Sequence, residues 1–174
     1  MPNYRRFPPD NRPIFITLVT YQRRPILVDH RGALRHALEQ TRNSLPFDLH
    51  AIVLLPDHCH LIMQLPEGET DFSVRINQIK GRFSRALPGL DETTDHSRQK
   101  RRERAVWQRR FWEHVIRNEE EFARHLDYIH FNPVKHGYAE RCRDWPWSSF
   151  HRCVGKGYYD IDWGVNIELD SAGE

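Results

Sequence analysis

Hydrophobic and polar positions along the chain follow two periods, one typical of strands and one typical of helices. Residues 14–20 (IFITLVT) are rich in β-branched and aromatic side chains, which predicts a strand. Residues 47–55 and 58–65 predict two further strands, and the two residues between them, Pro56–Asp57, predict an antiparallel hairpin. A shorter segment at residues 111–116 predicts a fourth strand.

Three other segments carry apolar residues at helical spacing. Residues 31–43 predict a first helix, and residues 71–87 predict a second helix with one buried stripe. The basic residues of the second helix lie off that stripe: Arg75, Lys80, Arg82 and Arg85. A third helix is expected to begin after the capping residue Asn118 and to run to about Phe131, because Pro133 should end it.

The resulting order is β-α-β-β-α-β followed by a helix, which is the ferredoxin-like pattern. We therefore expect an α+β fold, in which an antiparallel sheet carries helices on one face and is joined by a further helix. Residues 1–140 are predicted to form one domain. Within it, residues 88–105 lack periodicity and are dense in charge, which predicts a flexible basic insertion. Residues 141–174 are expected to form a C-terminal tail whose aromatic side chains pack back onto the domain.

The charge of the chain is unevenly distributed. The net charge is only +2, yet residues 75–110 contain 11 Lys or Arg and 4 Asp or Glu, so the net charge of this segment is +7 and that of the remainder is −5. Such asymmetry favours a surface that faces a polyanion such as a nucleic acid. A solvated basic loop with no partner is the alternative.

Composition excludes several other classes of protein. No apolar segment approaches the roughly 20 residues of a membrane helix, and the polar N-terminus does not resemble a signal peptide. Three cysteines without close pairs argue against a disulfide framework and a four-thiolate zinc site. We expect a cytoplasmic protein with no membrane partner.

The first candidate for chemistry is the pair His58 and His60 at the start of the third predicted strand. Side chains at positions i and i+2 of a strand point to the same face, so two imidazoles stand side by side and are able to hold one divalent metal ion. Two structural histidines near a turn are the alternative, because an isolated pair with this spacing is a weak signal.

The second candidate is the helix that carries Tyr128 and Asn132. These residues are four positions apart and project from one helical face. An amide oxygen is an acceptable ligand for Mg²⁺ or Mn²⁺, and a metal held by two imidazoles and an amide keeps open positions for a phosphate oxygen. Tyr128 would then lie beside the phosphorus as a nucleophile, unless it is simply a core tyrosine. Lys135 is placed to steady a phosphate or to offset the helix dipole.

Four segments in this order resemble the REP-associated tyrosine transposases, which are relatives of the single-strand insertion-sequence transposases in the HUH superfamily. The segments are residues 55–60 (LPDHCH), 108–114 (QRRFWEH), 127–137 (DYIHFNPVKHG) and 144–150 (DWPWSSF). The resemblance extends over nearly the whole chain, from Tyr4 to Trp163.

The resemblance implies that His58, His60 and Asn132 hold Mg²⁺ or Mn²⁺ and that Tyr128 is the single catalytic tyrosine. Several related transposases have glutamine where this chain has Asn132. The family acts on repetitive extragenic palindromes, short DNA hairpins flanked by a tetranucleotide. It cleaves and rejoins single strands there through a 5′-phosphotyrosine, as a monomer or a homodimer, which implies a protein associated with the bacterial nucleoid.

Basic residues are the candidates for binding the hairpin, and the affinity should fall strongly as the salt concentration rises. The N-terminal start also resembles the family and is a candidate for base recognition. The predicted DNA-binding residues are Tyr4, Arg5, Arg6, Arg82, Arg85, Arg98, Lys100, Arg101, Arg102, Arg104, Arg109, Arg110 and Lys135.

Two other functions compete with strand transfer. A hairpin-binding protein without chemistry would bind DNA independently of Tyr128, His58 and His60. A metal phosphoesterase would use an activated water, so the histidines would matter and the tyrosine would not. Covalent attachment of Tyr128 to DNA distinguishes strand transfer from both.

Overall fold

The computed structural model describes residues 11–87, 89 and 105–165. Four strands form one antiparallel sheet in the order β2-β3-β1-β4. They are β1 (Ile14–Val19), β2 (Asp48–Leu54), β3 (His58–Gln64) and β4 (Trp112–Val115). This order is that of the ferredoxin-like fold, so the predicted fold class is confirmed.

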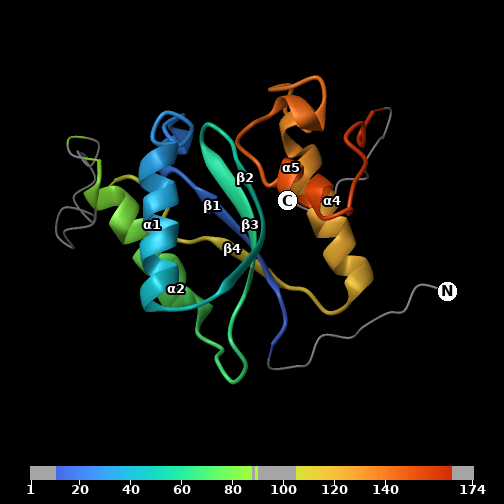
Figure 1. Cartoon of the computed structure of the whole chain (residues 1–174). Coiled ribbons are helices and arrows are strands. Elements are labelled where there is room, and N and C mark those ends of the chain that lie inside the picture. The colour runs from blue at the N-terminus through green and yellow to red at the C-terminus, as the bar shows by residue number, and fades with distance from the viewer. Residues whose placement is uncertain (1–10, 88, 90–104, 166–174) are drawn as a thin grey trace.

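Helices cover both faces of the sheet (Figure 1). Helices α1 (Arg31–Ser44) and α2 (Phe72–Arg85) pack together on one face, as predicted for the two crossover helices. Helices α4 (Glu119–Lys135) and α5 (Phe150–Gly155) lie on the other face. Two short 3-10 helices, η1 (Tyr21–Arg23) and η2 (Cys142–Asp144), complete the described elements.

Alternation along the strands divides the interior into two cores. Ile16 and Leu18 of β1 point toward α1 and α2, whereas Phe15 points toward α4. Strand β3 alternates in the same way, so Leu61 joins the first core and Ile62 the second. Each of these side chains is at most 4% exposed, and burying one contributes about 1.5–3 kcal/mol to the free energy of unfolding. The sheet is therefore fixed between two apolar layers.

Helix α4 continues through Pro133, so the prediction that this proline ends the helix is wrong. Proline removes one backbone donor and crowds the preceding turn, which costs most in a helix interior. Here it lies in the last turn and is buried. The helix ends instead at Lys135, followed by Gly137 with a φ of 71°, a conformation that glycine adopts without strain.

Arg75 is also placed differently from the prediction. It is only 3% exposed, and its guanidinium donates to the backbone oxygens of Pro46 and Asp71 and pairs with Glu69. A multiply bonded guanidinium tolerates burial, and the long aliphatic stem packs like an apolar side chain. Arg75 thus ties α2 to the segment before β2 and is not available to a ligand.

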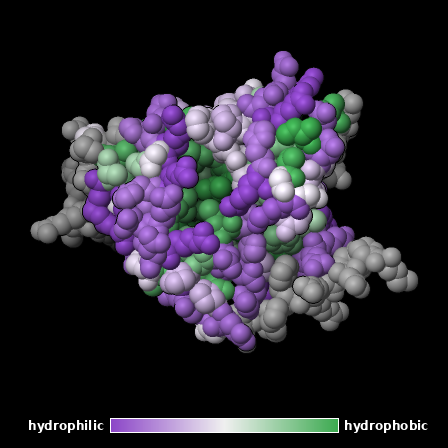
Figure 2. All heavy atoms as spheres, in the orientation of Figure 1, coloured by the Kyte–Doolittle hydropathy of each residue, from purple (hydrophilic) through white to green (hydrophobic). Residues whose placement is uncertain are grey.

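The segment after α4 covers part of the edge of β2. The Trp145 indole donates to the Leu54 oxygen at 2.9 Å, and the Leu54 amide donates to the Trp147 oxygen at 2.8 Å. Figure 2 shows a groove between α1 and the C-terminal elements, with hydrophobic residues in its floor. Residues of α1, β2 and the 146–149 segment line this groove.

None of the helices in the described part of the chain combines the length and apolar character needed to cross a bilayer.

Candidate active site

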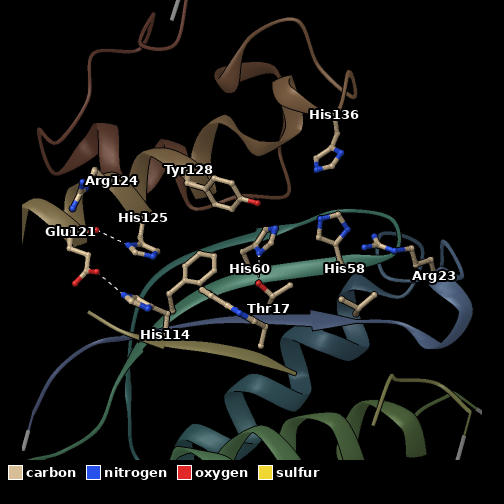
Figure 3. Close-up of a pocket in the computed structure, with 13 residues that line it drawn as sticks. Thr17, Arg23, His58, His60, His114, Glu121, Arg124, His125, Tyr128 and His136 are labelled. Carbon is tan, nitrogen blue, oxygen red and sulfur yellow. Dashed lines mark hydrogen bonds and ion pairs between the residues drawn. The ribbon is translucent and has the colours of Figure 1, made fainter. Parts of the chain in front are cut away.

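A cavity of about 490 Å³ lies on the α4 face of the sheet. Strands β1, β3 and β4 and helix α4 contribute its walls (Figure 3). His58, His60 and Tyr128 all line it. The structure therefore brings together the histidine pair and the tyrosine that the sequence placed on separate elements.

The register of β1 and β3 explains why both histidines face this cavity. Val19 pairs with His58 and Thr17 pairs with His60, and paired residues of antiparallel strands share a face. The two imidazole centroids are 5.0 Å apart. The histidines are 6% and 5% exposed, so they are largely withdrawn from water.

Each imidazole is held through its Nδ1 atom. The Asp57 carboxylate lies 2.6 Å from Nδ1 of His58, and the Thr17 hydroxyl lies 2.8 Å from Nδ1 of His60. The Nε2 atom of His60 is buried and has no hydrogen-bonding partner within the described residues. A ligating imidazole commonly donates its other N–H to a carboxylate or hydroxyl while the second nitrogen binds metal. The pair could therefore hold a metal ion.

The local charges favour this arrangement. Burial raises the pKa of Asp57, but the hydrogen bond and charge of His58, together with Arg23, outweigh burial and hold this pKa below its usual value. Asp57 is therefore an anion beside His58. Burial lowers the pKa of His60 well below that of a free imidazole, and the charges of His58 and His136 act in the same direction. A neutral imidazole is the form that binds a metal.

Helix α4 directs the Tyr128 side chain at the histidine pair. Its ring centroid is 5.2 Å from that of His60 and 5.9 Å from that of Phe15, and the residue is 9% exposed. In Figure 3 the hydroxyl points toward the histidines. The Lys135 ammonium lies 5.2 Å from the centroid of the Tyr128 ring. A cation at this position could pair with a phosphate group bound at the tyrosine.

Asn132, the predicted third ligand, lies one turn after Tyr128 on α4. It is 1% exposed, and neither its amide oxygen nor its amide nitrogen has a hydrogen-bonding partner within the described residues. An unpaired buried amide lowers the free energy of unfolding by about 1–3 kcal/mol. A bound group that contacts this amide would therefore be stabilising. Asn132 is not among the residues that line the cavity.

His136 also lines the cavity, which sequence reasoning missed. Its ring centroid is 5.4 Å from that of His58. The residue follows Tyr128 by two turns and therefore shares its side of the helix, but this is visible only once α4 is known to continue past Pro133. In the described part of the chain, no three side chains of the His, Cys, Asp and Glu types are grouped to hold a metal ion.

The predicted DNA-binding residues separate into three groups. Arg82 and Arg85 lie on α2, on the sheet face opposite the cavity, so the structure does not bring them to Tyr128. Arg109 and Arg110 are exposed just before β4, and Lys135 is beside Tyr128. The following residues lie outside the described part of the chain: Tyr4, Arg5, Arg6, Arg98, Lys100, Arg101, Arg102 and Arg104.

Two arginines that were not predicted line the cavity itself, Arg23 and Arg124. Arg23 comes from η1 after β1, and Arg124 comes from the second turn of α4. Neither lies in the basic segment that the charge distribution singled out. Only the fold shows that they meet at one cavity.

A ferredoxin-like sheet with a strand-borne histidine pair beside a helix-borne tyrosine is the arrangement expected of a single-tyrosine transposase. The family described as "Transposase IS200 like" matches residues 13–132. The chain is 47% identical to a Haemophilus influenzae protein described as a REP-associated tyrosine transposase, over 100% of this chain and 99% of that one. It is 42% identical to the REP-associated tyrosine transposase of Escherichia coli K12, over 100% and 98% of the two chains. The chain belongs to the family of REP-associated tyrosine transposases.

A solved structure agrees with the sequence relatives. It is the structure of a REP-associated tyrosine transposase bound to a REP hairpin, with a TM-score of 0.79 and 40% sequence identity. The match covers 100% of this chain and 98% of that chain. The resemblance expected from the four sequence motifs is therefore confirmed.

Proposed function

We propose that this protein cleaves and rejoins single-stranded DNA beside REP-type hairpins, with Tyr128 as the nucleophile and Mg²⁺ or Mn²⁺ as the cofactor. The observation that carries the proposal is the unpartnered Nε2 atom of His60, on an imidazole whose ring centroid is 5.2 Å from that of Tyr128. The solved relative bound to a REP hairpin supports the choice of DNA. A protein with this substrate would act at the bacterial nucleoid.

The chemistry is a transesterification that conserves one phosphodiester. The Tyr128 oxygen attacks the phosphorus, a bond from that oxygen to phosphorus forms, and the bond to the 3′-oxygen breaks. The phenolic proton leaves the tyrosine, and the 3′-oxygen departs as a hydroxyl. Attack by a 3′-hydroxyl on the 5′-phosphotyrosine reverses these changes and joins the strands. No external energy source is needed, because each bond that breaks is replaced by one of the same kind.

The chain supplies specific groups for each part of this reaction. His58, His60 and Asn132 would hold the divalent ion, which polarises a phosphate oxygen as a Lewis acid when bound. Asp57 and Thr17 hold the two imidazoles through Nδ1, which would leave Nε2 of each ring for the ion. Lys135 places positive charge beside the nucleophile, where a phosphotyrosine would carry negative charge.

Covalent trapping tests the proposal. The protein is incubated with 5′- and 3′-labelled hairpin DNA and Mg²⁺ or Mn²⁺, then separated under denaturing conditions. The parent protein should form an adduct that carries the strand 3′ of the cut, and chelation of the metal should abolish it. Tyr128→Phe should bind the hairpin yet form no adduct.

Tyr138→Phe is the matched control, because this tyrosine is exposed, follows α4 and does not line the cavity. It should form the adduct as the parent does. Cleavage by Tyr128→Phe at the parent rate would contradict the nucleophile. Tight hairpin binding by the parent with no adduct under any metal condition would favour a binding protein without chemistry.

A further inference from the structure

A row of side chains crosses the sheet and links the candidate metal site to an exposed tryptophan. Thr17 of β1 pairs with His60 of β3 on one side and with Trp112 of β4 on the other. Paired residues face the same way, so all three lie on the α4 face. Neighbouring strands are about 4.8 Å apart, which places the backbone of Trp112 roughly 10 Å from that of His60.

Trp112 is unusually accessible for so large an aromatic residue. It is 46% exposed, although it lines the same cavity as Tyr128. It makes a T-shaped contact with the buried ring of Phe15, with centroids 5.6 Å apart and planes at 75°. This contact anchors the indole but leaves nearly half of it in solvent. Packing alone does not account for a tryptophan on the four-residue edge strand beside the cavity.

Trp112, His114 and His125 form a platform of three rings stacked in series, with His114 in the middle. Trp112 and His114 have centroids 6.0 Å apart with planes at 11°, and His114 and His125 have centroids 5.1 Å apart with planes at 13°. The three rings are therefore nearly parallel. Figure 3 shows His114 and His125 adjacent on the side of the cavity away from His58.

The platform is held in place by polar contacts. Nε2 of His114 lies 2.7 Å from a Glu121 oxygen, and the other Glu121 oxygen accepts from the Arg117 amide at 2.6 Å. Nδ1 of His125 lies 2.7 Å from the Glu121 backbone oxygen. These contacts join β4 to the first turn of α4, the helix that carries Tyr128. The ring platform and the nucleophile are thus positioned by the same helix.

We propose that Trp112, backed by His114, forms a stacking site for one unpaired nucleobase of the DNA strand, next to the phosphate that Tyr128 attacks. The proposal rests on the proposed strand transfer, since it assigns the base neighbouring the cut. An aromatic ring stacks on any base, and each stacked base strengthens binding of single-stranded DNA considerably. Arg124, exposed and lining the same cavity, supplies positive charge for the backbone of that strand. The site holds the strand beside the nucleophile, whereas a hairpin stem has no unpaired base to offer.

Binding measurements with two DNAs test this site. One DNA is a hairpin with a single-stranded flank, and the other is the same hairpin trimmed to its stem. Trp112→Ala should bind the flanked DNA roughly tenfold to a hundredfold more weakly than the parent and the trimmed hairpin equally well. Trp112→Phe, which keeps a stacking ring, should restore most of the difference. Tyr158→Ala is the matched control, because Tyr158 is 63% exposed and does not line the cavity.

Abasic substitution locates the base. For the parent protein, removing the base at one flank position should weaken binding as much as the Trp112→Ala substitution does. For the Trp112→Ala variant, removing the same base should weaken binding no further. Equal affinity of parent and Trp112→Ala for the flanked DNA would overturn the site. So would an equal loss for the trimmed hairpin, or additive losses at every abasic position.

Covalent trapping separates this proposal from the proposed function. If the parent forms the Tyr128 adduct but Trp112→Ala keeps full affinity for the flank, strand transfer stands and the stacking site fails. If no adduct forms while Trp112→Ala loses affinity only for the flanked DNA, the stacking site stands and the chemistry fails.

Discussion

The Thr17 hydroxyl lies 2.8 Å from Nδ1 of His60, across the pairing of β1 with β3. This contact holds the imidazole through Nδ1 and leaves Nε2 without a hydrogen-bonding partner within the described residues. Thr17→Val keeps the shape of the side chain and removes the hydroxyl, so it should weaken Mn²⁺ affinity by roughly 10- to 100-fold. Calorimetric titration of the protein with Mn²⁺ measures the change.

Thr17→Ser is the control for this substitution, because it keeps the hydroxyl and removes only a methyl group. It should bind Mn²⁺ with nearly the parent affinity. Equal Mn²⁺ affinities for the valine variant and the parent would show that the threonine does not orient His60 for a metal.

Asn132 offers a test of the third ligand that does not depend on catalysis. Its amide is buried without a partner within the described residues, so Asn132→Leu should raise the free energy of unfolding without metal by about 1–3 kcal/mol. If Asn132 holds the ion, the same variant should gain much less stability from Mn²⁺ than the parent gains. Thermal unfolding with and without Mn²⁺ measures both effects.

His136→Ala is the comparison, since His136 lines the cavity from the end of α4. We expect it to keep most of the stabilisation by Mn²⁺. A larger loss for His136→Ala than for Asn132→Leu would move the third ligand to the histidine.

Each half of the site, the pair of residues on β3 and the pair on α4, was predictable on its own from local rules. His58 and His60 are two residues apart, so alternation alone puts them on one face of β3. Tyr128 and Asn132 are four residues apart, so helical periodicity puts them on one side of α4. In the structure, α4 lies against the sheet face that carries the histidines, opposite the two crossover helices.

The partners of these residues were not predictable, because they depend on register and on helix length. Thr17 reaches His60 only because β1 and β3 pair in one particular register, which the sequence pattern does not specify. His136 reaches the cavity because α4 continues past Pro133 to Lys135. Trp112 lines the cavity because β4 pairs with β1 in the register that sets Trp112 opposite Thr17, which the sequence pattern does not specify.

Tyr159 is expected to position helix α4 through Asp127, the residue before Tyr128. The Tyr159 hydroxyl donates to the Asp127 carboxylate at 2.8 Å, and burial raises the pKa of Asp127 while this hydrogen bond lowers it. Tyr159→Phe removes the bond, so the pKa of Asp127 should rise further. A folded-state pKa above the unfolded one means that stability falls as pH rises. The variant should therefore lose more stability relative to the parent at about pH 7 than at about pH 4.

Urea unfolding at the two pH values measures this difference. Asp127→Asn in the Tyr159→Phe background removes the titrating group and should abolish the pH dependence of the loss. A loss of the same size at both pH values would assign the effect to packing and not to the carboxylate.

Ser149 connects three elements of the second core, and its loss should destabilise the whole domain. Its hydroxyl accepts from the Ile52 amide of β2 at 2.9 Å and lies 2.8 Å from Nε2 of the buried His130 on α4. Ser149→Ala leaves both of these groups without their partner, and each unpaired buried group costs about 1–3 kcal/mol. We expect the free energy of unfolding to fall by about 2 kcal/mol or more, measured by urea titration. Ser148→Ala is the neighbouring control, because within the described residues the Ser148 hydroxyl accepts one hydrogen bond, from the Phe150 amide at 3.2 Å. Ser148→Ala should lower the free energy of unfolding by well under half as much as Ser149→Ala does. Equal losses for the two serines would show that the contact between Ser149 and His130 does not hold α4 to the sheet.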